Sequence, residues 1–248
     1  MASRAQHESV SSYVALVGRR EEQSRLLSRL QKRKSMLVYG PKGVGKSRLL
    51  EEFAEGHAHA LYIKAFTAPR ELAMGVITRL RESFVRNLRL PSNPKILSTS
   101  SLKGVIQRAL DQAEFFLVLD HFAGPSRITT AMIKEFHYYG RTPLYFAART
   151  PHMEDIGALI PLCSDKSERL EMKNFPASVA LEFARREAER ICLTASNLDE
   201  TVKFIADKSE GSPGALLQMI AMAQRAEYRV CDQIKAHTLY LDFCMGQY

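Results

Sequence analysis

Short apolar runs alternate along this chain with longer stretches in which apolar residues recur at helical spacing. Five runs have the length of a buried strand, the last of them the weakest: residues 36–39, 60–63, 115–119, 144–148 and 169–172. Helical spacing covers residues 46–55 and 70–88, while residues 90–101, rich in proline, serine and threonine, are typical of a loop. Strands that alternate with helices form a parallel sheet wrapped by helices. The pattern therefore predicts an α/β fold with a five-stranded parallel sheet.

The pattern changes at residue 176, after which no strand-like run remains and apolar residues fall at helical spacing. The first helix is indicated by Ala180, Phe183, Ala184, Ala188 and Ile191. A second begins near Asp199, and the sequence Gly211-Ser212-Pro213-Gly214 then interrupts the pattern before it resumes over residues 215–226. We expect a small helical lid here. Residues 227–248 are too few for a separate sensor or winged-helix domain.

The composition is that of a packed globular protein, since 46% of the 248 residues are hydrophobic. The apolar runs are far shorter than the roughly 20 residues that span a bilayer, and the first ten residues lack the apolar core of a secretory signal. We therefore expect a soluble, cytoplasmic protein with no membrane partner. The four cysteines form no C-x-x-C pair, so we expect reduced, mostly buried thiols rather than a zinc site or a disulfide framework.

The formal net charge of +8 makes partners that carry phosphate plausible, although many proteins of this size are mildly basic without binding nucleic acid. A local excess of positive charge lies between residues 79 and 108, where Glu82 is the only acid. The basic residues of this segment are Arg79, Arg81, Arg86, Arg89, Lys95, Lys103 and Arg108. Of these, our candidate contacts to nucleic-acid phosphates are Arg86, Arg89, Lys95 and Lys103. A solvated helix face that is basic for no functional reason is an equal alternative.

Residues 40–47, GPKGVGKS, match the phosphate-binding pattern G-x-x-x-x-G-K-[ST] between an apolar strand and a helical stretch, which is the context that the pattern requires. The glycines let backbone N–H groups converge on a phosphate, and the following helix presents its positive end to the anion. Lys46 is expected to reach the β- and γ-phosphates of ATP, and the Ser47 hydroxyl to bind Mg²⁺. The candidate nucleotide-binding residues of this loop are Gly40, Pro41, Lys42, Gly43, Val44, Gly45, Lys46, Ser47 and Arg48. An incidental glycine turn is the alternative interpretation.

An acidic residue at the end of a strand should accompany such a loop. Asp120 provides it, directly after the apolar run 115–119. This run is long enough to bury a strand and to place Asp120 at its carboxyl end beside the loop, where the carboxylate can hold Mg²⁺ through water. Ser47 and Asp120 are therefore the candidate metal ligands. Read alone, the apolar run would be ordinary core.

In these features the sequence resembles the AAA+ and STAND branch of P-loop ATPases, particularly its origin-recognition-like and archaeal-ATPase-like members. Three further segments carry the resemblance, which spans residues 14–226. They are Val17-Gly18-Arg19-Arg20-Glu21-Glu22, Tyr145-Phe146-Ala147-Ala148-Arg149-Thr150 and Gly211-Ser212-Pro213. Each has a local alternative, respectively a solvated turn, a surface charge at a strand end and a helix-breaking turn.

The resemblance implies a strand order of 5-1-4-3-2 and a role for each segment. Val17, Gly18 and Arg19 would close over the adenine base, Arg149 would read the γ-phosphate, and Pro213 would be the contact of the lid with the nucleotide. It also implies three parts of the chain. These are an N-terminal tail over residues 1–13, a nucleotide-binding α/β domain over 14–174, and a helical lid with a C-terminal tail over 175–248.

The sequence departs from the family pattern at two positions. Where many members follow the strand aspartate with a second acid that activates water, this chain has His121. An imidazole supplies no fixed negative charge beside Mg²⁺, so we expect slow hydrolysis, with Lys46, Asp120, His121 and Arg149 as the catalytic group. The second departure is Gly214, which stands near the place where origin-recognition-like members carry a lid arginine.

An intact phosphate grip with an altered water-activating position suits a nucleotide-dependent switch better than a fast catalyst. Our first hypothesis is an ATPase that assembles as a homo-oligomer on double-stranded DNA when ATP is bound, like a transposition helper or loader. The alternative is a STAND-type signalling or assembly switch that acts on a protein partner without DNA. A small-molecule kinase is weaker, because no second substrate pocket is recognisable.

Overall fold

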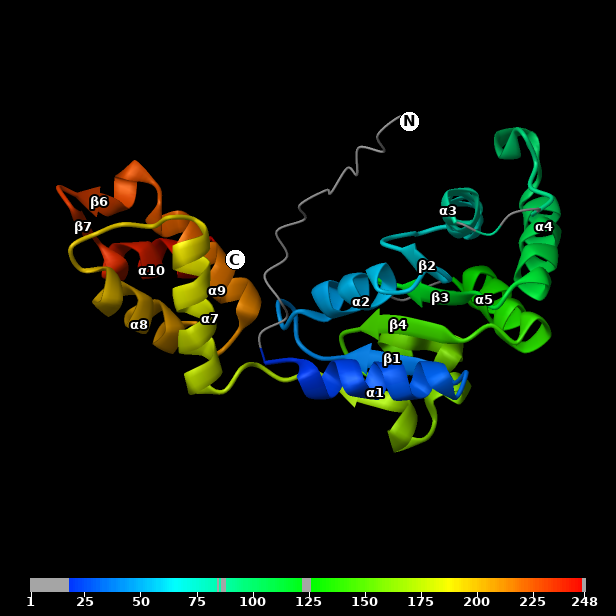
Figure 1. The fold of residues 1–248 in the computed structure, drawn as a ribbon, viewed down its shortest axis with the longest axis horizontal. Coiled ribbons are helices and arrows are strands. Elements are labelled where there is room, and N and C mark those ends of the chain that lie inside the picture. Colours follow the sequence, from blue (N-terminus) through cyan, green and yellow to red (C-terminus); the bar gives the residue numbers. More distant parts are fainter. Residues whose placement is uncertain (1–17, 84, 86–87, 122–125, 247–248) are drawn as a thin grey trace, which may run out of the picture.

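The computed structural model describes residues 18–83, 85, 88–121 and 126–246, which form an α/β domain and a helical lid joined by a single linker (Figure 1). Val17 and Arg86, which are candidate site residues from the sequence, lie outside the described residues. None of the described helices is both long enough and apolar enough to cross a bilayer.

The α/β domain is built on a parallel sheet in the order β2-β3-β4-β1-β5, which is the predicted 5-1-4-3-2 order. Its strands are β1 (Met36–Tyr39), β2 (Ala60–Ile63), β3 (Phe116–Leu119), β4 (Leu144–Ala148) and β5 (Arg169–Glu171). All of them lie within one residue of the predicted bounds. Because parallel strands end at the same edge, the segments that follow β1, β3 and β4 meet there.

Helices cover both faces of this sheet, as alternating strand residues require. Val38, Phe116 and Tyr145 pack with α1 and α2, whereas Leu37, Leu117 and Phe146 belong to the larger core under α3, α4 and α5. The helices of this domain are α1 (Arg20–Gln31), α2 (Lys46–Glu55), α3 (Pro69–Glu82), α4 (Thr99–Gln112), α5 (Arg127–Gly140) and α6 (Met153–Ile156). Short 3₁₀ turns lie at Pro94–Ile96, Gly157–Cys163 and Lys166–Glu168.

Two predicted boundaries in this domain are wrong. The helix expected over residues 70–88 ends at Glu82, because Ser83 is extended (ψ 151°) and its hydroxyl donates to the Leu80 carbonyl. The loop expected over residues 90–101 contains the start of α4. Ser98 caps that helix by accepting a hydrogen bond from the Ser101 N–H at 3.1 Å, so these serines initiate a helix rather than fill a loop.

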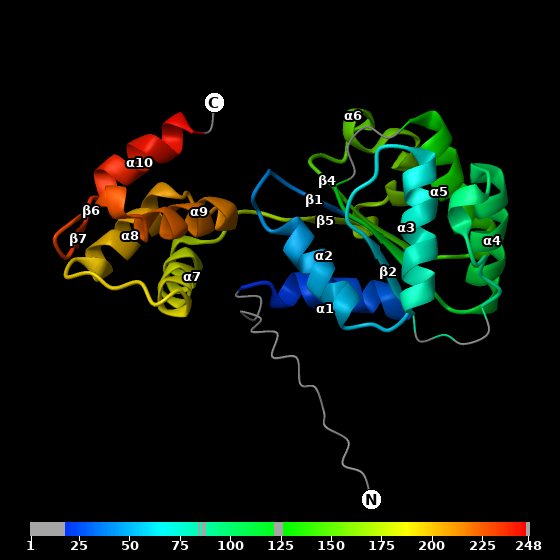
Figure 2. The same cartoon turned by 90° about the horizontal axis from the view of Figure 1, so that it is seen from above.

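The lid lies beyond the linker and has its own apolar core (Figure 2). Its helices are α7 (Ala177–Arg190), α8 (Leu198–Lys208), α9 (Pro213–Ala223) and α10 (Ala236–Met245), with a 3₁₀ turn at Ala226–Tyr228. The expectation that no strand follows residue 176 is wrong, since β6 (Arg229–Val230) and β7 (Gln233–Ile234) pair as an antiparallel hairpin. Strands of two residues are too short to produce an alternating pattern in the sequence.

The cysteines correct a further expectation. Cys163 is buried and Cys244 half-buried, but Cys192 and Cys231 are exposed, so the thiols are not mostly buried. Both exposed cysteines lie in turns with positive φ (53° and 52°), where the chain reverses at the surface. Burial raises the pKa of the Cys163 thiol.

Candidate functional site

The phosphate loop runs from the end of β1 into α2 at the carboxyl edge of the sheet. Gly45, the residue before α2, has a φ of 99°, a conformation that favours glycine. No side chain caps the helix, and its first hydrogen bond from the N-terminal end joins the Leu49 N–H to the Gly45 carbonyl. The N–H groups of Lys46 and Ser47 precede this bond, at the end of the helix where an anion can bind.

Lys46 is half-buried and folds back over this loop. Its ammonium donates to the carbonyl oxygens of Gly40 and Pro41 at 2.7 and 2.8 Å. Burial lowers its pKa, while the neighbouring carboxylates of Asp120 and Asp155 act in the opposite direction and Arg149 lowers the pKa further. Three charged side chains predicted from the sequence, Lys46, Asp120 and Arg149, thus interact electrostatically at one edge of the sheet.

Asp120 is buried at the end of β3 and is held by two donors. Its Oδ2 accepts from the Tyr62 hydroxyl at 3.0 Å, and its Oδ1 accepts from the His121 N–H at 2.8 Å. Burial and the adjacent carboxylate raise the pKa of Tyr62, so its hydroxyl remains a donor at neutral pH. Tyr62 is a residue of the site that was not predicted from the sequence. Its position near the end of β2, the strand beside β3, is the only sequence signal that could have indicated it.

His121 is exposed and has a left-handed backbone conformation (φ 50°). Its Nδ1 lies 3.0 Å from Asp120 Oδ2 and 3.1 Å from the Lys64 carbonyl oxygen. Both neighbours are acceptors, which assigns the proton of the neutral ring to Nδ1 and leaves Nε2 as an acceptor. The imidazole thus lies directly beside the carboxylate.

Arg149 is exposed at the end of β4, and its carbonyl accepts from the Gly40 N–H at 3.2 Å. The next residue, Thr150, donates through its N–H and its hydroxyl to Asp155 Oδ2 at 2.7 and 2.6 Å. Asp155 is a second carboxylate near Lys46, and it was not predicted from the sequence. Its place in α6, directly after β4, could have indicated it.

Arg19 is buried between the phosphate loop and the linker. Its Nη2 donates to the carbonyls of Val44 (3.0 Å) and Lys173 (2.8 Å), and its Nη1 to Glu22 at 2.8 Å. The guanidinium carbon also lies 4.5 Å from the ring centroid of Phe175. Arg19 therefore ties the loop to the linker through protein contacts, a role that its predicted place over the adenine base did not suggest. Gly18 is exposed beside it.

The lid contacts the phosphate loop directly. The Gly214 N–H donates to the Gly43 carbonyl at 2.8 Å, and a Cβ added to Gly214 would lie 2.9 Å from Gly43 Cα. This close approach leaves no room for the arginine that relatives are expected to carry here. Pro213 is buried at the start of α9, next to this contact.

The basic segment between residues 79 and 108 is less free than its sequence implies. Arg79 pairs with Glu82 at 2.9 Å, and Lys103 pairs at 2.7 Å with Glu135 of α5. Arg81 donates to the carbonyls of Pro91 and Ser92, which fastens the loop after α3. Arg89 and Lys95 are exposed.

The metal ligands and hydrogen-bond donors at the carboxyl edge of the sheet fit Mg²⁺ and a nucleoside triphosphate. Ser47 and Asp120 offer the hard oxygen ligands that Mg²⁺ prefers, and Lys46 with the first turn of α2 offers donors to phosphate. Among the described residues, no group of three or more His, Cys, Asp or Glu side chains could hold a metal ion. Few protein ligands are usual for Mg²⁺ that is also bound by phosphates.

The contact between Tyr62 and Asp120 leads to a prediction. Tyr62→Phe removes a hydrogen bond to a charged acceptor, so Mg²⁺-ATP affinity should fall about fivefold to tenfold, while ATP binding without metal stays unchanged. Calorimetric titrations with Mg²⁺ and with EDTA measure both. Tyr145→Phe is the matched control, because its hydroxyl bonds the Lys34 carbonyl at the opposite edge of the sheet. Equal losses in the two media would contradict a role in positioning Asp120.

Comparisons with known proteins agree with this geometry. The sequence model of the AAA ATPase domain family matches residues 15–137. No curated protein matches the sequence. The Walker-type ATPase of Pyrococcus abyssi is similar in structure, with a TM-score of 0.66 at 17% identity over 94% of this chain and 73% of that chain.

Two other solved structures show the same fold. The ORC1 protein of Aeropyrum pernix, solved in complex with DNA, has a TM-score of 0.65 at 16% identity. The aligned region covers 92% of this chain and 65% of the ORC1 chain. A STAND protein with a tetratricopeptide repeat sensor from Pyrococcus horikoshii has a TM-score of 0.53 at 14% identity, over 90% of this chain and 32% of its own. This chain therefore spans less than two thirds of either protein.

Proposed function

We propose that this chain, whose residues 15–137 match the AAA ATPase domain family and whose fold is shared with a Walker-type ATPase, an ORC1 protein and a STAND protein, binds Mg²⁺-ATP, hydrolyses it slowly and uses the bound nucleotide to set the position of its lid. The observation that carries this proposal is the hydrogen bond from the Gly214 N–H of the lid to the Gly43 carbonyl of the phosphate loop. A ligand that differs by one phosphate can shift such an equilibrium if it binds the two lid positions with different affinity.

The linker supports the same proposal. Arg19 bonds the loop at Val44 and the linker at Lys173, while its guanidinium packs on Phe175. Phe175 in turn donates its N–H to the Gly211 carbonyl before α9 at 2.8 Å. A continuous set of contacts thus connects the phosphate loop with the lid.

Slow hydrolysis is supported by the group that follows Asp120. Bound Mg²⁺ would supply charge stabilisation to the phosphates. His121 Nδ1 is committed to Asp120 and the Lys64 carbonyl, so only Nε2 could accept a proton from water. This leaves the chain without the fixed negative charge that relatives place beside the metal.

We propose that the partner of the switch is double-stranded DNA. The chain would assemble on it as a homo-oligomer when ATP is bound. The net charge of +8 and the exposed Arg89 and Lys95 support it. The ion pairs of Arg79 and Lys103 favour the second candidate, a protein partner without DNA. Retention of duplex DNA in ATP that is lost steeply between low and moderate salt would decide for DNA, and its failure would leave the protein partner.

A trypsin site in the linker can report on the position of the lid. Trypsin cuts after Lys173, the residue whose carbonyl Arg19 holds, so the rate of this cut reports on the linker contact. We expect the rate to differ between saturating ATP and ADP. Gly214→Ala should overpack the contact with Gly43, at a cost of about 1–3 kcal/mol, and so raise the cutting rate several-fold without nucleotide.

Gly104→Ala is the control for this experiment, because a Cβ at Gly104 meets nothing within 4 Å. Cleavage after Lys173 should not change in that variant. Equal cutting in ATP and ADP by the unmodified protein would contradict the switch, whatever the variants do.

A further inference from the structure

The edge of the sheet opposite the phosphate loop brings two distant segments together. Because β1 and β4 are parallel with Met36 opposite Tyr145, the residues before each strand lie side by side. The Tyr145 hydroxyl donates to the Lys34 carbonyl at 3.1 Å, and the Leu144 N–H donates to Ser35 Oγ at 3.0 Å. The turns that end α1 and α5 are thus neighbours.

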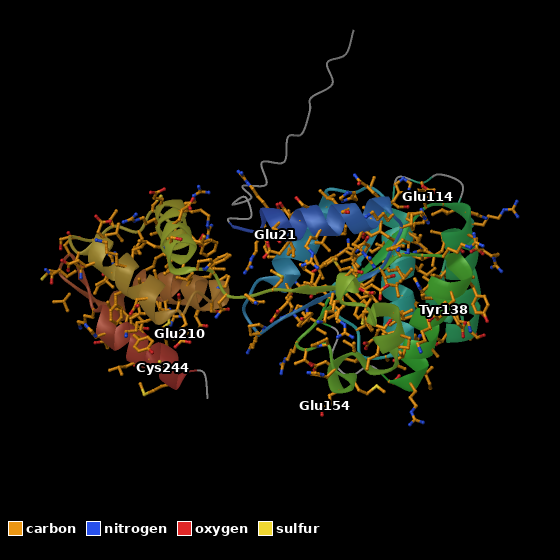
Figure 3. The ribbon with its side chains drawn as sticks, turned by 90° about the horizontal axis from the view of Figure 1, so that it is seen from below. Glu21, Glu114, Tyr138, Glu154, Glu210 and Cys244 are labelled. Carbon is orange, nitrogen blue, oxygen red and sulfur yellow. The ribbon has the colours of Figure 1, made fainter. Side chains whose placement is uncertain are left out.

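Positive charge and aromatic rings gather on these two turns. Lys32, Arg33, Lys34 and Arg141 are exposed, and together with Tyr138 and Tyr139 we call them the amino-edge surface. The two tyrosines are 58% and 77% exposed, and Figure 3 shows Tyr138 on α5 at the end of the α/β domain away from the lid.

Acidic residues offset only part of this charge. Glu114 pairs with Arg33 at 3.2 Å and is itself exposed. Asp111 of α4 accepts from Gln107 at 3.2 Å, and Gln107 lies beside Gly140. Asp165 is a third acid, since its carboxylate interacts electrostatically with Lys34. Four basic side chains against three acids leave a small positive excess on the surface.

The two arginines lie in turns that glycine adopts more easily. Arg33 (φ 50°) and Arg141 (φ 47°) both have the left-handed conformation just after a helix, where glycine is the usual residue. Glycine would form the same turns with less strain. The side chains of Arg33 and Arg141 are exposed on these neighbouring turns, so glycine substitutions there remove two positive charges and suit the backbone.

We propose that the amino-edge surface binds single-stranded nucleic acid. Lys32, Arg33, Lys34 and Arg141 would neutralise phosphates, and Tyr138 and Tyr139 would stack on unpaired bases, which is how sequence-tolerant single-strand surfaces work. Because duplex bases are not free to stack, the surface prefers single strands. It lies at the far edge of the sheet from Lys46, so this binding needs no ATP and does not depend on the proposed switch.

The test measures fluorescence anisotropy of labelled (dT)20, and of a duplex of the same length, with the full chain in EDTA. The double variant Arg33→Gly, Arg141→Gly should bind (dT)20 at least fivefold more weakly, with a salt slope shallower by about one. Its Tm should not fall, because glycine suits both turns. The double variant Tyr138→Ala, Tyr139→Ala should weaken (dT)20 about tenfold and leave duplex binding unchanged.

Arg185→Gln with Lys203→Gln, two exposed lid positions, is the matched loss of two charges and should bind (dT)20 normally. The proposal is overturned if the unmodified protein shows no salt-sensitive binding to (dT)20, or if this control loses as much affinity as the glycine variant. It is also overturned if polyglutamate displaces (dT)20 from the protein and binds the tyrosine variant undiminished, since the surface would then fit an acidic protein. Loss of ATP-dependent cleavage after Lys173 would not affect it.

Discussion

Lys46→Ala is expected to weaken ATP binding by about a hundredfold or more, because it removes charge-assisted hydrogen bonds to the phosphates that no neighbouring side chain replaces. In the free protein the Lys46 ammonium donates to the Gly40 and Pro41 carbonyls. These bonds hold the ammonium over the loop, at the first turn of α2, where an anion would bind. Calorimetric titration with Mg²⁺-ATP measures the loss, and thermal unfolding checks that the fold remains.

Lys42→Ala is the matched control, since Lys42 is an exposed lysine of the same loop, and its expected contact with phosphate is through the backbone N–H, which alanine keeps. The two variants lose the same formal charge, so a general electrostatic effect would weaken ATP binding equally in both. We expect Lys42→Ala to change the affinity by threefold at most, a difference typical of exposed charges. Unchanged affinity in Lys46→Ala would refute the assignment of the phosphate loop.

The sheet could be predicted from the sequence because its strands are buried on both faces. Such strands appear as continuous apolar runs, and even the three-residue β5 was recognisable as a weak fifth run. The boundaries of α3 and α4 could not be predicted as well. Serine is common in loops and at helix starts alike, and only the bond between Ser98 and the Ser101 N–H distinguishes the two.

Site residues that belong to a local sequence motif could be predicted. Site residues that act through contacts between strands were harder to predict. Lys46 and Asp120 follow from motifs, and the Asp120 carboxylate lies close enough to Lys46 to raise its pKa against the effect of burial. Tyr62 holds Asp120 from the neighbouring strand, a pairing that only the strand order reveals. For Arg19 the motif gave the position, but the side chain's partners depend on where the linker passes.

His121→Glu should raise the rate of ATP hydrolysis about tenfold or more, because a carboxylate in this position can accept a proton from water and adds negative charge beside the metal. The unmodified protein should turn over well below the median enzyme rate of roughly 10 per second. The gain depends on the backbone, since residue 121 has a left-handed conformation (φ 50°) that histidine tolerates better than glutamate. Steady-state phosphate release measures the rates.

Two variants separate charge from geometry in this experiment. His121→Gln has nearly the shape of glutamate without its charge, so it should hydrolyse ATP no faster than the unmodified protein. Asp120→Asn keeps an oxygen that can accept from Tyr62 but removes the negative charge, so both Mg²⁺-dependent ATP affinity and hydrolysis should fall. If the unmodified protein hydrolyses tens of ATP per second without a partner and His121→Glu is slower, then His121 Nε2 or Asp155 is a competent base, and the nucleotide is consumed rather than used to hold the lid.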